Sequence, residues 1–315
     1  MNILITGITG FVGSHLADYI VGSQDHIRVY GLARWRSPLN NISHLIIENK
    51  ITLLWGDLLD LPSIERALQI CQPKIIFHLA AQSYVPYSHE APISTLQTNV
   101  IGSANLFAAA EEVAGVIVAV SSSEVYGQPE YTPIDEKHPL NPISPYGVSK
   151  AAMDMLAYSE FIAHDLPVIR TRAFSHTGAR RGDVFVASAF AKQIAEIEVG
   201  QRDILYTGNL DSIRTWCDVG DMVRAYWVAA RLCILGEVYN IGGDRTTTIG
   251  EMLNILISLS DAKIIHRIDD SLLRPADVTL QIPDTSKFQK QTGWEPRIPL
   301  EETLENLLEY HRERI

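Results

Sequence analysis

Three glycines spaced by two residues each, directly behind the first apolar run of the chain, limit its fold more than any other feature. Residues 3–6 are predicted to form a buried strand, and Gly7, Gly10 and Gly13 then lead into a helical pattern. Glycine permits a tight turn and lets a pyrophosphate approach the free N–H groups at the helix start. The pattern predicts a dinucleotide cradle, with a plain strand-to-helix turn as the alternative. The candidate residues are Gly7, Thr9, Gly10, Phe11, Val12 and Gly13.

Short, continuous apolar runs alternate with helical patterns through the first half of the chain. Continuous apolar character is what a parallel strand covered on both faces requires. The predicted strands are residues 3–6, 28–32, 51–55, 75–79, 116–121 and 167–170. The predicted helices between them are residues 14–21, 61–70, 102–112 and 146–164. This alternation predicts an α/β fold with a doubly wound, parallel Rossmann sheet.

The pattern loosens into loops and shorter helices from about Arg172 onward. A helix at 218–235, a short strand at 238–241 and an amphipathic helix at 300–314 stand out. We therefore expect a smaller, discontinuous C-terminal lobe that binds substrate. The predicted division assigns residues 1–170 and 212–246 to the cofactor domain, and residues 171–211 and 247–315 to the lobe.

Composition and charge exclude several classes of protein. The chain is 46% apolar and 20% charged, without the ~18-residue apolar run of a membrane span. A formal charge of −11 disfavours a nucleic-acid partner. The ten histidines lack metal-ligand spacing, so no metal is expected. Three scattered cysteines, Cys71, Cys217 and Cys233, and a chain that opens on its first strand favour a cytoplasmic location.

The end of the second predicted strand should set the choice of cofactor. An acidic residue there would accept hydrogen bonds from ribose hydroxyls and repel a 2′-phosphate. This chain has Ala33 at that position, followed by Arg34 and Arg36. Guanidinium groups would donate charge-assisted hydrogen bonds to a 2′-phosphate, so NADP is the expected cofactor. The alternative is that the arginines are solvated and either cofactor is accepted.

The ends of the third and fourth predicted strands add further cofactor contacts. Asp57 and Leu58 follow the third strand, where they could reach the adenine. Leu79, Ala80 and Ala81 end the fourth, where small residues would let the cofactor lie on the sheet. Each pair is a weak signal alone, but their order along successive strands strengthens it.

Tyr146 and Lys150 are four residues apart, so on a helix both project from one face. A nearby cation favours the phenolate, which would make Tyr146 a usable acid or base, and Lys150 could also hold the nicotinamide ribose. Ser122 follows a buried strand and could polarise a substrate oxygen shared with Tyr146. Glu124 would supply the second acid/base that removal of a proton beside a ketone needs. A surface YxxxK pair and an exposed loop carboxylate are the alternatives.

Taken with these residues, nearly the whole chain resembles the extended short-chain dehydrogenase/reductase family of nucleotide-sugar enzymes, and most closely its GDP-mannose 4,6-dehydratase group. The motifs that carry the resemblance are residues 7–13, 34–37, 80–85, 121–127, 144–150, 180–182, 208–214, 274–278 and 292–294. The resemblance implies that hydride passes from C4 of the sugar to NADP while Tyr146 takes the hydroxyl proton. Glu124 would then remove the C5 proton, water would leave from C6, and the hydride would return there.

The resemblance also implies further contacts around the cofactor and the substrate. His176 and Arg181 would join the cofactor site, which also includes Tyr146 and Lys150. Three positions depart from the group. Ser122 stands where a threonine is usual and keeps its hydroxyl, Ser175 stands where an Asn is common, and Ala189 stands where a lysine usually meets the diphosphate. Lys192, one helical step further, would then substitute. The implied substrate residues are Ser83, Ser122, Ser175, Val186, Lys192, Arg214 and Arg274.

Two other functions remain open at this stage. The GDP-4-keto-6-deoxymannose reductase group shares the Tyr/Lys pair, often has a Glu like Glu124, and resembles residues 190–227 well. A cofactor-binding regulator that has lost its chemistry is the third reading. The family also implies a homodimer or homotetramer, in which the helix that begins at Tyr146 pairs across a dimer and residues 34–37 reach a neighbour.

Overall fold

Seven parallel strands form the central sheet of the protein, in the order β10-β6-β5-β4-β1-β2-β3. The computed structural model describes residues 1–23, 26–111, 113, 115–273 and 277–315. The strands of this sheet are β1 (Asn2–Thr6), β2 (Arg28–Ala33), β3 (Ile51–Trp55), β4 (Ile75–His78), β5 (Val116–Ser122), β6 (Val168–Ala173) and β10 (Val238–Ile241). The chain runs outward from β1 to β2 and β3, and then in the opposite direction from β4 to β6. The predicted doubly wound sheet is thus confirmed.

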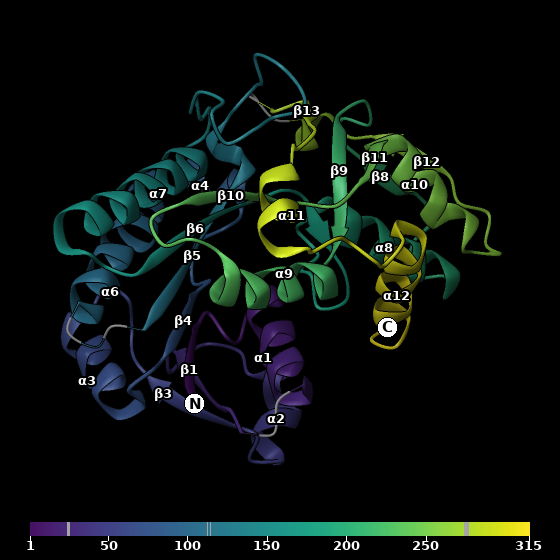
Figure 1. Cartoon of the computed structure of the whole chain (residues 1–315). Coiled ribbons are helices and arrows are strands. Elements are labelled where there is room, and N and C mark those ends of the chain that lie inside the picture. The colour runs from purple at the N-terminus through teal and green to yellow at the C-terminus, as the bar shows by residue number, and fades with distance from the viewer. Residues whose placement is uncertain (24–25, 112, 114, 274–276) are drawn as a thin grey trace.

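Helices cover both faces of this sheet (Figure 1). One layer contains α1 (Phe11–Ser23), α2 (Ser43–Ile47), α9 (Val219–Leu232) and α11 (Ser286–Thr292), and the other contains α3 (Leu61–Cys71), α6 (Gly102–Ala110) and α7 (Pro145–His164). Successive strand residues point to opposite faces, so Ile3 and Ile5 pack into the first layer and Leu4 into the second. Burial on both faces explains why β1, β4 and β5 have nearly continuous apolar sequences.

Short helical segments fill the connections at one end of the sheet. Before α6 the chain forms α4 (Val85–Glu90), α5 (Pro92–Leu96) and a π-helical turn, η2 (Gln97–Ile101). The 3-10 turns η1 (Asn40–Ile42) and η3 (Ser123–Val125) precede α2 and follow β5. Because these segments follow the carboxyl ends of β2, β4 and β5, they lie where an open α/β sheet binds its ligands.

The second lobe has its own sheets and its own apolar core. Its larger sheet joins β7 (His176–Thr177), β9 (Ile213–Asp218), β11 (Arg245–Thr248) and β13 (Leu280–Gln281), and its smaller sheet pairs β8 (Leu205–Thr207) with β12 (His266–Ile268). The helices are α8 (Val186–Glu198), α10 (Ile249–Ser258) and α12 (Leu300–Arg312), with the 3-10 turn η4 (Asp270–Leu272). Apolar side chains of these three helices form the lobe's core. The lobe is therefore more regular than the loops and shorter helices that the sequence predicted.

Sheet membership can be compared with the predicted division of the chain. Helix α9 and strand β10, from the segment 212–246, pack with the central sheet, whereas β9 and β11 belong to the second lobe. Strand β6 continues beyond residue 170 to Ala173. The division into domains stays a prediction. By sheet membership, the part of 212–246 that packs with the central sheet lies between the end of β9 at Asp218 and the start of β11 at Arg245. Within the described ranges, no helix combines the length and the apolar character needed to cross a membrane.

Candidate active site

A cleft of about 1490 Å³ runs along the carboxyl ends of the central strands and is lined by residues of both the sheet and the second lobe. The glycine turn forms one end of it. Gly7 has a φ of +73°, and a Cβ on Gly13 would lie 2.2 Å from the carbonyl oxygen of Gly7. Glycine at position 13 therefore lets α1 begin directly against the turn, with its free N–H groups toward the cleft. All of the predicted cradle residues between Gly7 and Gly13 line the cleft.

The end of β2 lines the next part of the cleft. Ala33 is 4% exposed, and the two arginines that follow it, Arg34 and Arg36, line the cleft together with Ser37. The guanidinium groups thus lie on the same side of the cleft as the glycine turn, because β1 and β2 are neighbours in the sheet. This arrangement is suited to an anionic group near the ribose end of a dinucleotide.

Asp57 and Leu58 follow β3, and the structure gives both a local role. The Asp57 carboxylate accepts a hydrogen bond from the Leu59 N–H at 3.1 Å, which closes the turn after the strand. Leu58 is buried, and its carbonyl accepts a hydrogen bond of 2.8 Å from the Asn105 amide. Both residues line the cleft, and their contact with an adenine stays a prediction.

A hydroxyl that the sequence reasoning missed ties β1 to the end of β4. The Thr6 Oγ1 accepts hydrogen bonds from the N–H groups of Leu79 at 3.2 Å and Ala80 at 3.1 Å. It also lies 2.9 Å from the Nδ1 of the buried His78. The predicted small residues Ala80 and Ala81 therefore sit in a fixed loop against the cleft. A polar residue at the end of an otherwise apolar strand is the signal that could have indicated this role.

Asn99, also missed, fixes the loop that follows. Its Oδ1 accepts a 2.8 Å hydrogen bond from the Gln82 N–H, and its Nδ2 donates to the Gln82 carbonyl and to the Ser149 Oγ, each at 2.9 Å. Ser149 directly precedes Lys150 in α7. This buried amide thus connects the end of β4 to the helix that carries the predicted catalytic pair.

Helix α7 begins so that Tyr146 and Lys150 face the cleft. Ser144 caps the helix by accepting a 3.0 Å hydrogen bond from the Gly147 N–H, and Pro145 occupies the first turn, where its missing N–H costs nothing. The Lys150 Nζ donates a 2.6 Å hydrogen bond to the Val120 carbonyl in β5. The predicted pair is therefore held against the strand that ends in Ser122.

Ser122 and Tyr146 both line the cleft, with the Ser122 side chain within hydrogen-bonding reach of the Tyr146 phenol. The pKa of Tyr146 is raised to about 12, mainly by burial and in part by the charge of Glu124, against lowering by the Ser122 hydrogen bond and by Arg181. Burial lowers the pKa of Lys150 to about 8, and Asp154 opposes that shift. The expected lowering of the phenol pKa by a nearby cation is thus outweighed by desolvation, and the cation that acts on the phenol is Arg181.

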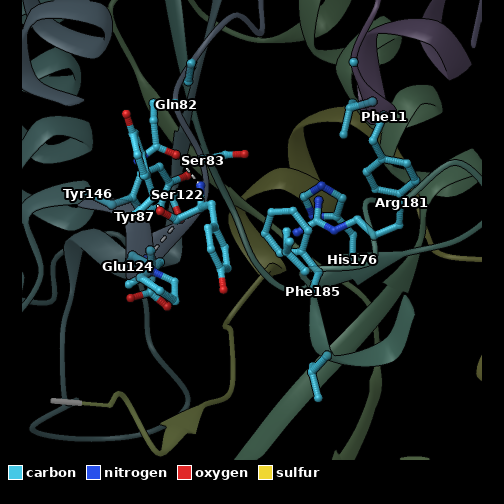
Figure 2. A pocket seen from close by; sticks show the side chains of 18 of the residues that line it. Phe11, Gln82, Ser83, Tyr87, Ser122, Glu124, Tyr146, His176, Arg181 and Phe185 are labelled. Carbon is cyan, nitrogen blue, oxygen red and sulfur yellow. Dashed lines mark hydrogen bonds between the residues drawn. The ribbon is translucent and has the colours of Figure 1, made fainter. Parts of the chain in front are cut away.

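Glu124 lies in η3, directly after Ser122, and is half-buried. Its N–H donates a 3.2 Å hydrogen bond to the Ser122 Oγ, and its Oε1 accepts one of 3.3 Å from the Gln281 Nε2 in β13. Figure 2 shows Glu124 below Ser122 and Tyr146 on one wall of the cleft. The structure brings Ser122, Glu124, Tyr146 and Lys150 together as the sequence predicted.

The facing wall is built from an arginine among aromatic rings (Figure 2). The Arg181 guanidinium carbon lies 3.6 Å from the centroid of the Phe185 ring and 5.0 Å from that of Phe11. The His176 ring stacks on Phe11 at 6.0 Å between centroids. Burial lowers the pKa of His176 to about 4 and that of Arg181 to about 10. The Arg181 guanidinium on this wall is partly desolvated by burial, which strengthens its attraction for an anion.

The predicted substrate residues divide into three groups. Ser83, Ser175, Val186 and Arg214 line the cleft, together with Ser122. Lys192 is absent from the described lining; its Nζ donates a 2.6 Å hydrogen bond to the exposed Asp183. Arg274 lies outside the described residues. Arg214 donates to the carbonyls of Ile213 and Val278, and one of its nitrogens lies 3.8 Å from Asp277.

Several lining residues of the second lobe were not foreseen. They are Gln193, Arg202, Tyr206, Asn209, Trp216 and Gln281. Arg202 donates a 2.6 Å hydrogen bond to Glu196, and Gln193 exchanges hydrogen bonds with the backbone of Tyr206 at 2.8 and 3.2 Å. Apart from Asn209, these positions lie in no motif, and they come together only through the packing of α8, β8, β9 and β13 in the second lobe.

A doubly wound sheet with a glycine turn after β1, and with a serine, a tyrosine and a lysine at the end of β5 and the start of α7, defines a dinucleotide-dependent enzyme. The sequence matches the family described as GDP-mannose 4,6 dehydratase over residues 4–307. The chain belongs to that family, which is one of extended short-chain dehydrogenase/reductase type.

Two of the relatives that this chain resembles have different activities in their names. A GDP-mannose 4,6-dehydratase of Yersinia enterocolitica is 30% identical, over 95% of this chain and 90% of that protein. A GDP-6-deoxy-D-mannose reductase of Pseudomonas aeruginosa is 29% identical, over 100% of this chain and 98% of that protein. The solved structure of RMD from Pseudomonas aeruginosa complexed with NADPH superposes with a TM-score of 0.86 at 28% identity, covering 100% of this chain and 99% of that one.

Proposed function

We propose that this protein is a GDP-mannose 4,6-dehydratase, which converts GDP-mannose to GDP-4-keto-6-deoxymannose. The coarser conclusion, an enzyme of GDP-sugar dehydration or reduction, follows from the family and from both relatives. The observation that carries the finer proposal is that two proton-transfer groups, the Tyr146 phenol and the Glu124 carboxylate, line the same cleft, close enough for the charge of Glu124 to raise the pKa of the phenol. A simple reduction needs one proton donor, whereas an elimination beside a ketone needs a second group to take a carbon-bound proton.

The residues at this end of the cleft fit the proton transfers of a dehydration. A bound nicotinamide dinucleotide supplies the site that accepts the C4 hydride and later returns it to C6. Tyr146, hydrogen-bonded to Ser122, takes the proton of the sugar 4-hydroxyl. Glu124 takes the C5 proton, which the new 4-ketone has made acidic, and returns it with the departing C6 hydroxyl as water. When the hydride returns to C6, C5 takes up the proton that Tyr146 held, so that Tyr146 returns to its starting protonation state. Lys150 would hold the ribose of the cofactor; burial lowers the pKa of its ammonium to about 8, and Asp154 opposes that shift.

We propose NADP as the cofactor, a finer choice than the nicotinamide dinucleotide that similar structures hold. Such structures contain NADPH or NAD. The support for NADP is the pair Arg34 and Arg36 at the cleft, after a buried Ala33 where a carboxylate would repel the 2′-phosphate. Arg181, His176 and Phe11 would line the remaining length of the cofactor.

We further propose that Ser83, Ser175, Val186 and Arg214 contact the GDP-sugar, and that Arg202 adds a cation toward the diphosphate. For assembly we propose a homodimer or homotetramer. Exposed apolar residues on α7, namely Val148, Met155, Tyr158 and Ile162, support pairing of that helix across a dimer. The three cysteines are free thiols, which supports a cytoplasmic location.

Incubation with GDP-mannose, without added reductant, tests the proposed reaction. The expected result is a product lighter by one water, because the hydride that leaves C4 returns to C6 in the same cycle. Glu124→Gln should still oxidise C4 but stall at elimination, so that reduced cofactor accumulates on the enzyme and absorbs in the reduced-nicotinamide band. Unchanged GDP-mannose with the native protein would exclude the dehydratase.

The reductase is the second candidate, and one observation favours it. The alignment with the Pseudomonas aeruginosa reductase needs 319 positions for a chain of 315 residues, whereas that with the Yersinia enterocolitica dehydratase needs 338. A reductase would consume NADPH only when a GDP-4-keto sugar is supplied. A cofactor-binding regulator would turn over neither substrate.

A further inference from the structure

Strand β13 of the second lobe reaches the catalytic end of the central sheet. It pairs with β9, where Gln281 stands beside Arg214. Gln281 is 2% exposed, and its side chain crosses from the second-lobe sheet to Glu124, 157 residues earlier in the chain. A buried polar side chain at this boundary must satisfy its amide within the protein, since burial without hydrogen bonds is costly.

Two hydrogen bonds fix the orientation of the Gln281 amide. The Ser123 hydroxyl donates to the Gln281 Oε1 at 3.1 Å, so the amide oxygen is turned toward Ser123. The Gln281 Nε2 then faces the Glu124 Oε1 and donates to it at 3.3 Å. Ser123 is 4% exposed, so water does not readily compete for the bond that sets this orientation.

The segment that carries Gln281 is itself held by the second lobe. The Ser212 hydroxyl donates to the Asp277 carboxylate at 3.1 Å, and Arg214 donates to the Val278 carbonyl. Strand pairing then continues through Leu280 beside Ile213. The backbone at Gln281 is therefore held by the lobe that lines the substrate side of the cleft, while Ser123, the neighbour of Glu124, orients the amide.

We propose that Gln281 is a positioning residue that holds the Glu124 carboxylate in the orientation from which it exchanges a proton with substrate. The inference rests on the proposed function in that Glu124 acts as an acid or base. A glutamate side chain has three rotatable torsions, and a hydrogen bond from a buried, oriented amide selects among its rotamers. The second lobe thus contributes to the orientation of a group on the central sheet.

Gln281→Leu removes the amide that donates to Glu124 and replaces it with an apolar side chain of similar size. Loss of a hydrogen bond to a charged group should lower kcat roughly 10- to 100-fold. KM for the sugar nucleotide and the affinity for NADP should change less than about twofold, because Gln281 is expected to touch neither phosphate. Gln128→Leu is the matched control, since Gln128 joins the same two segments by accepting hydrogen bonds from Thr279 at 3.1 and 3.3 Å without contacting Glu124.

A double-mutant cycle with Glu124→Gln separates positioning from general support of the fold. If Gln281 acts through Glu124, Gln281→Leu should cost almost nothing further in a protein that already carries Glu124→Gln. Ser123→Ala, which frees the amide to rotate, should show a smaller loss of kcat that also vanishes in that background. The inference would be overturned if the kcat losses of Gln281→Leu and Glu124→Gln multiplied in the double variant, or if Gln128→Leu lost as much kcat as Gln281→Leu.

The substrate that the native protein turns over separates this inference from the proposed function. If GDP-mannose is dehydrated, the cycle is measured on dehydration. If only a GDP-4-keto sugar is reduced with NADPH, the dehydratase proposal fails and the cycle is measured on reduction. In that case the inference stands if Glu124→Gln lowers kcat and Gln281→Leu adds no further loss, and it falls if Glu124→Gln leaves kcat unchanged.

Discussion

The two walls of the cleft are held in place by different means. On the catalytic wall, Ser122 ends β5, Tyr146 and Lys150 begin α7, and the Lys150 Nζ is fixed at 2.6 Å from the Val120 carbonyl. On the facing wall, Arg181 lies in the connection between β7 and α8 and is held by the rings of Phe11 and Phe185. The first wall depends on backbone geometry and the second on side-chain contacts.

This difference assigns different tasks to the two walls. Groups at the ends of packed strands and helices keep the sub-ångström placement that proton transfer needs. Side chains held by cation–π contacts and surface ion pairs can exchange those partners for a ligand at little cost. We therefore expect substitutions on the catalytic wall to lower kcat. Substitutions of second-lobe residues around the cleft, the second-lobe wall, should raise KM.

Tyr146→Phe should have the largest effect, because it removes the proton-transferring hydroxyl while keeping the ring. General acid–base catalysis is worth about 10² to 10⁴ in rate, so kcat should fall by that factor while NADP binding persists. Tyr158→Phe, in the same helix and 43% exposed, is the matched control. Steady-state rates within tenfold of the native enzyme would remove Tyr146 from the catalytic set.

Arg214→Ala tests the second-lobe wall. The loss of a guanidinium that meets a diphosphate should raise KM for the sugar nucleotide roughly tenfold or more, with cofactor affinity unchanged. Arg245→Ala changes an exposed arginine on the neighbouring strand β11 and should leave KM as it is. An unchanged KM in Arg214→Ala would mean that its contacts with Asp277 and the Val278 carbonyl are purely structural.

Arg34→Ala tests cofactor choice by titration calorimetry on the protein freed of cofactor. The native protein should bind NADP more tightly than NAD, and the variant should lose roughly tenfold of that preference, since one charge-assisted contact to the 2′-phosphate disappears. Arg28→Ala, at the opposite end of β2, should leave the preference intact. Equal affinities of the native protein for the two cofactors would contradict the assignment of NADP.

Lys192→Ala should have the smallest effect, and it tests whether Lys192 belongs to the second-lobe wall. Its Nζ is paired with Asp183 on an exposed part of α8, where such pairs contribute about 0–1 kcal/mol. We expect KM to stay within about twofold of the native value. A large rise in KM would instead restore Lys192 as the cation that meets the diphosphate, as the resemblance to the family implied.

Features set by neighbouring residues could be predicted from the sequence, whereas contacts between distant segments could not. Strand β3 and strand β10 coincide with their predicted ranges, because each is a short, mostly apolar run. The cradle from Gly7 to Gly13 and the pair Tyr146 and Lys150 are short-range patterns, so their geometry follows once the local element is known. Asn99 and Gln281 could not be found this way, since their partners lie 17 to 158 residues away.

The sequence by itself determined the order of strands and helices, the glycine turn at the start of α1 and the catalytic groups that share one helix face or follow one strand. Local sterics and burial act over a few residues and so can be read from neighbouring letters. The tertiary structure decided that burial, and not a nearby ammonium, dominates the pKa of Tyr146. It also decided that Arg181 faces the phenol from the other wall, and that a glutamine from β13 holds Glu124. Desolvation and contacts between the sheet and the second lobe depend on how distant segments pack, and no local pattern contains that information.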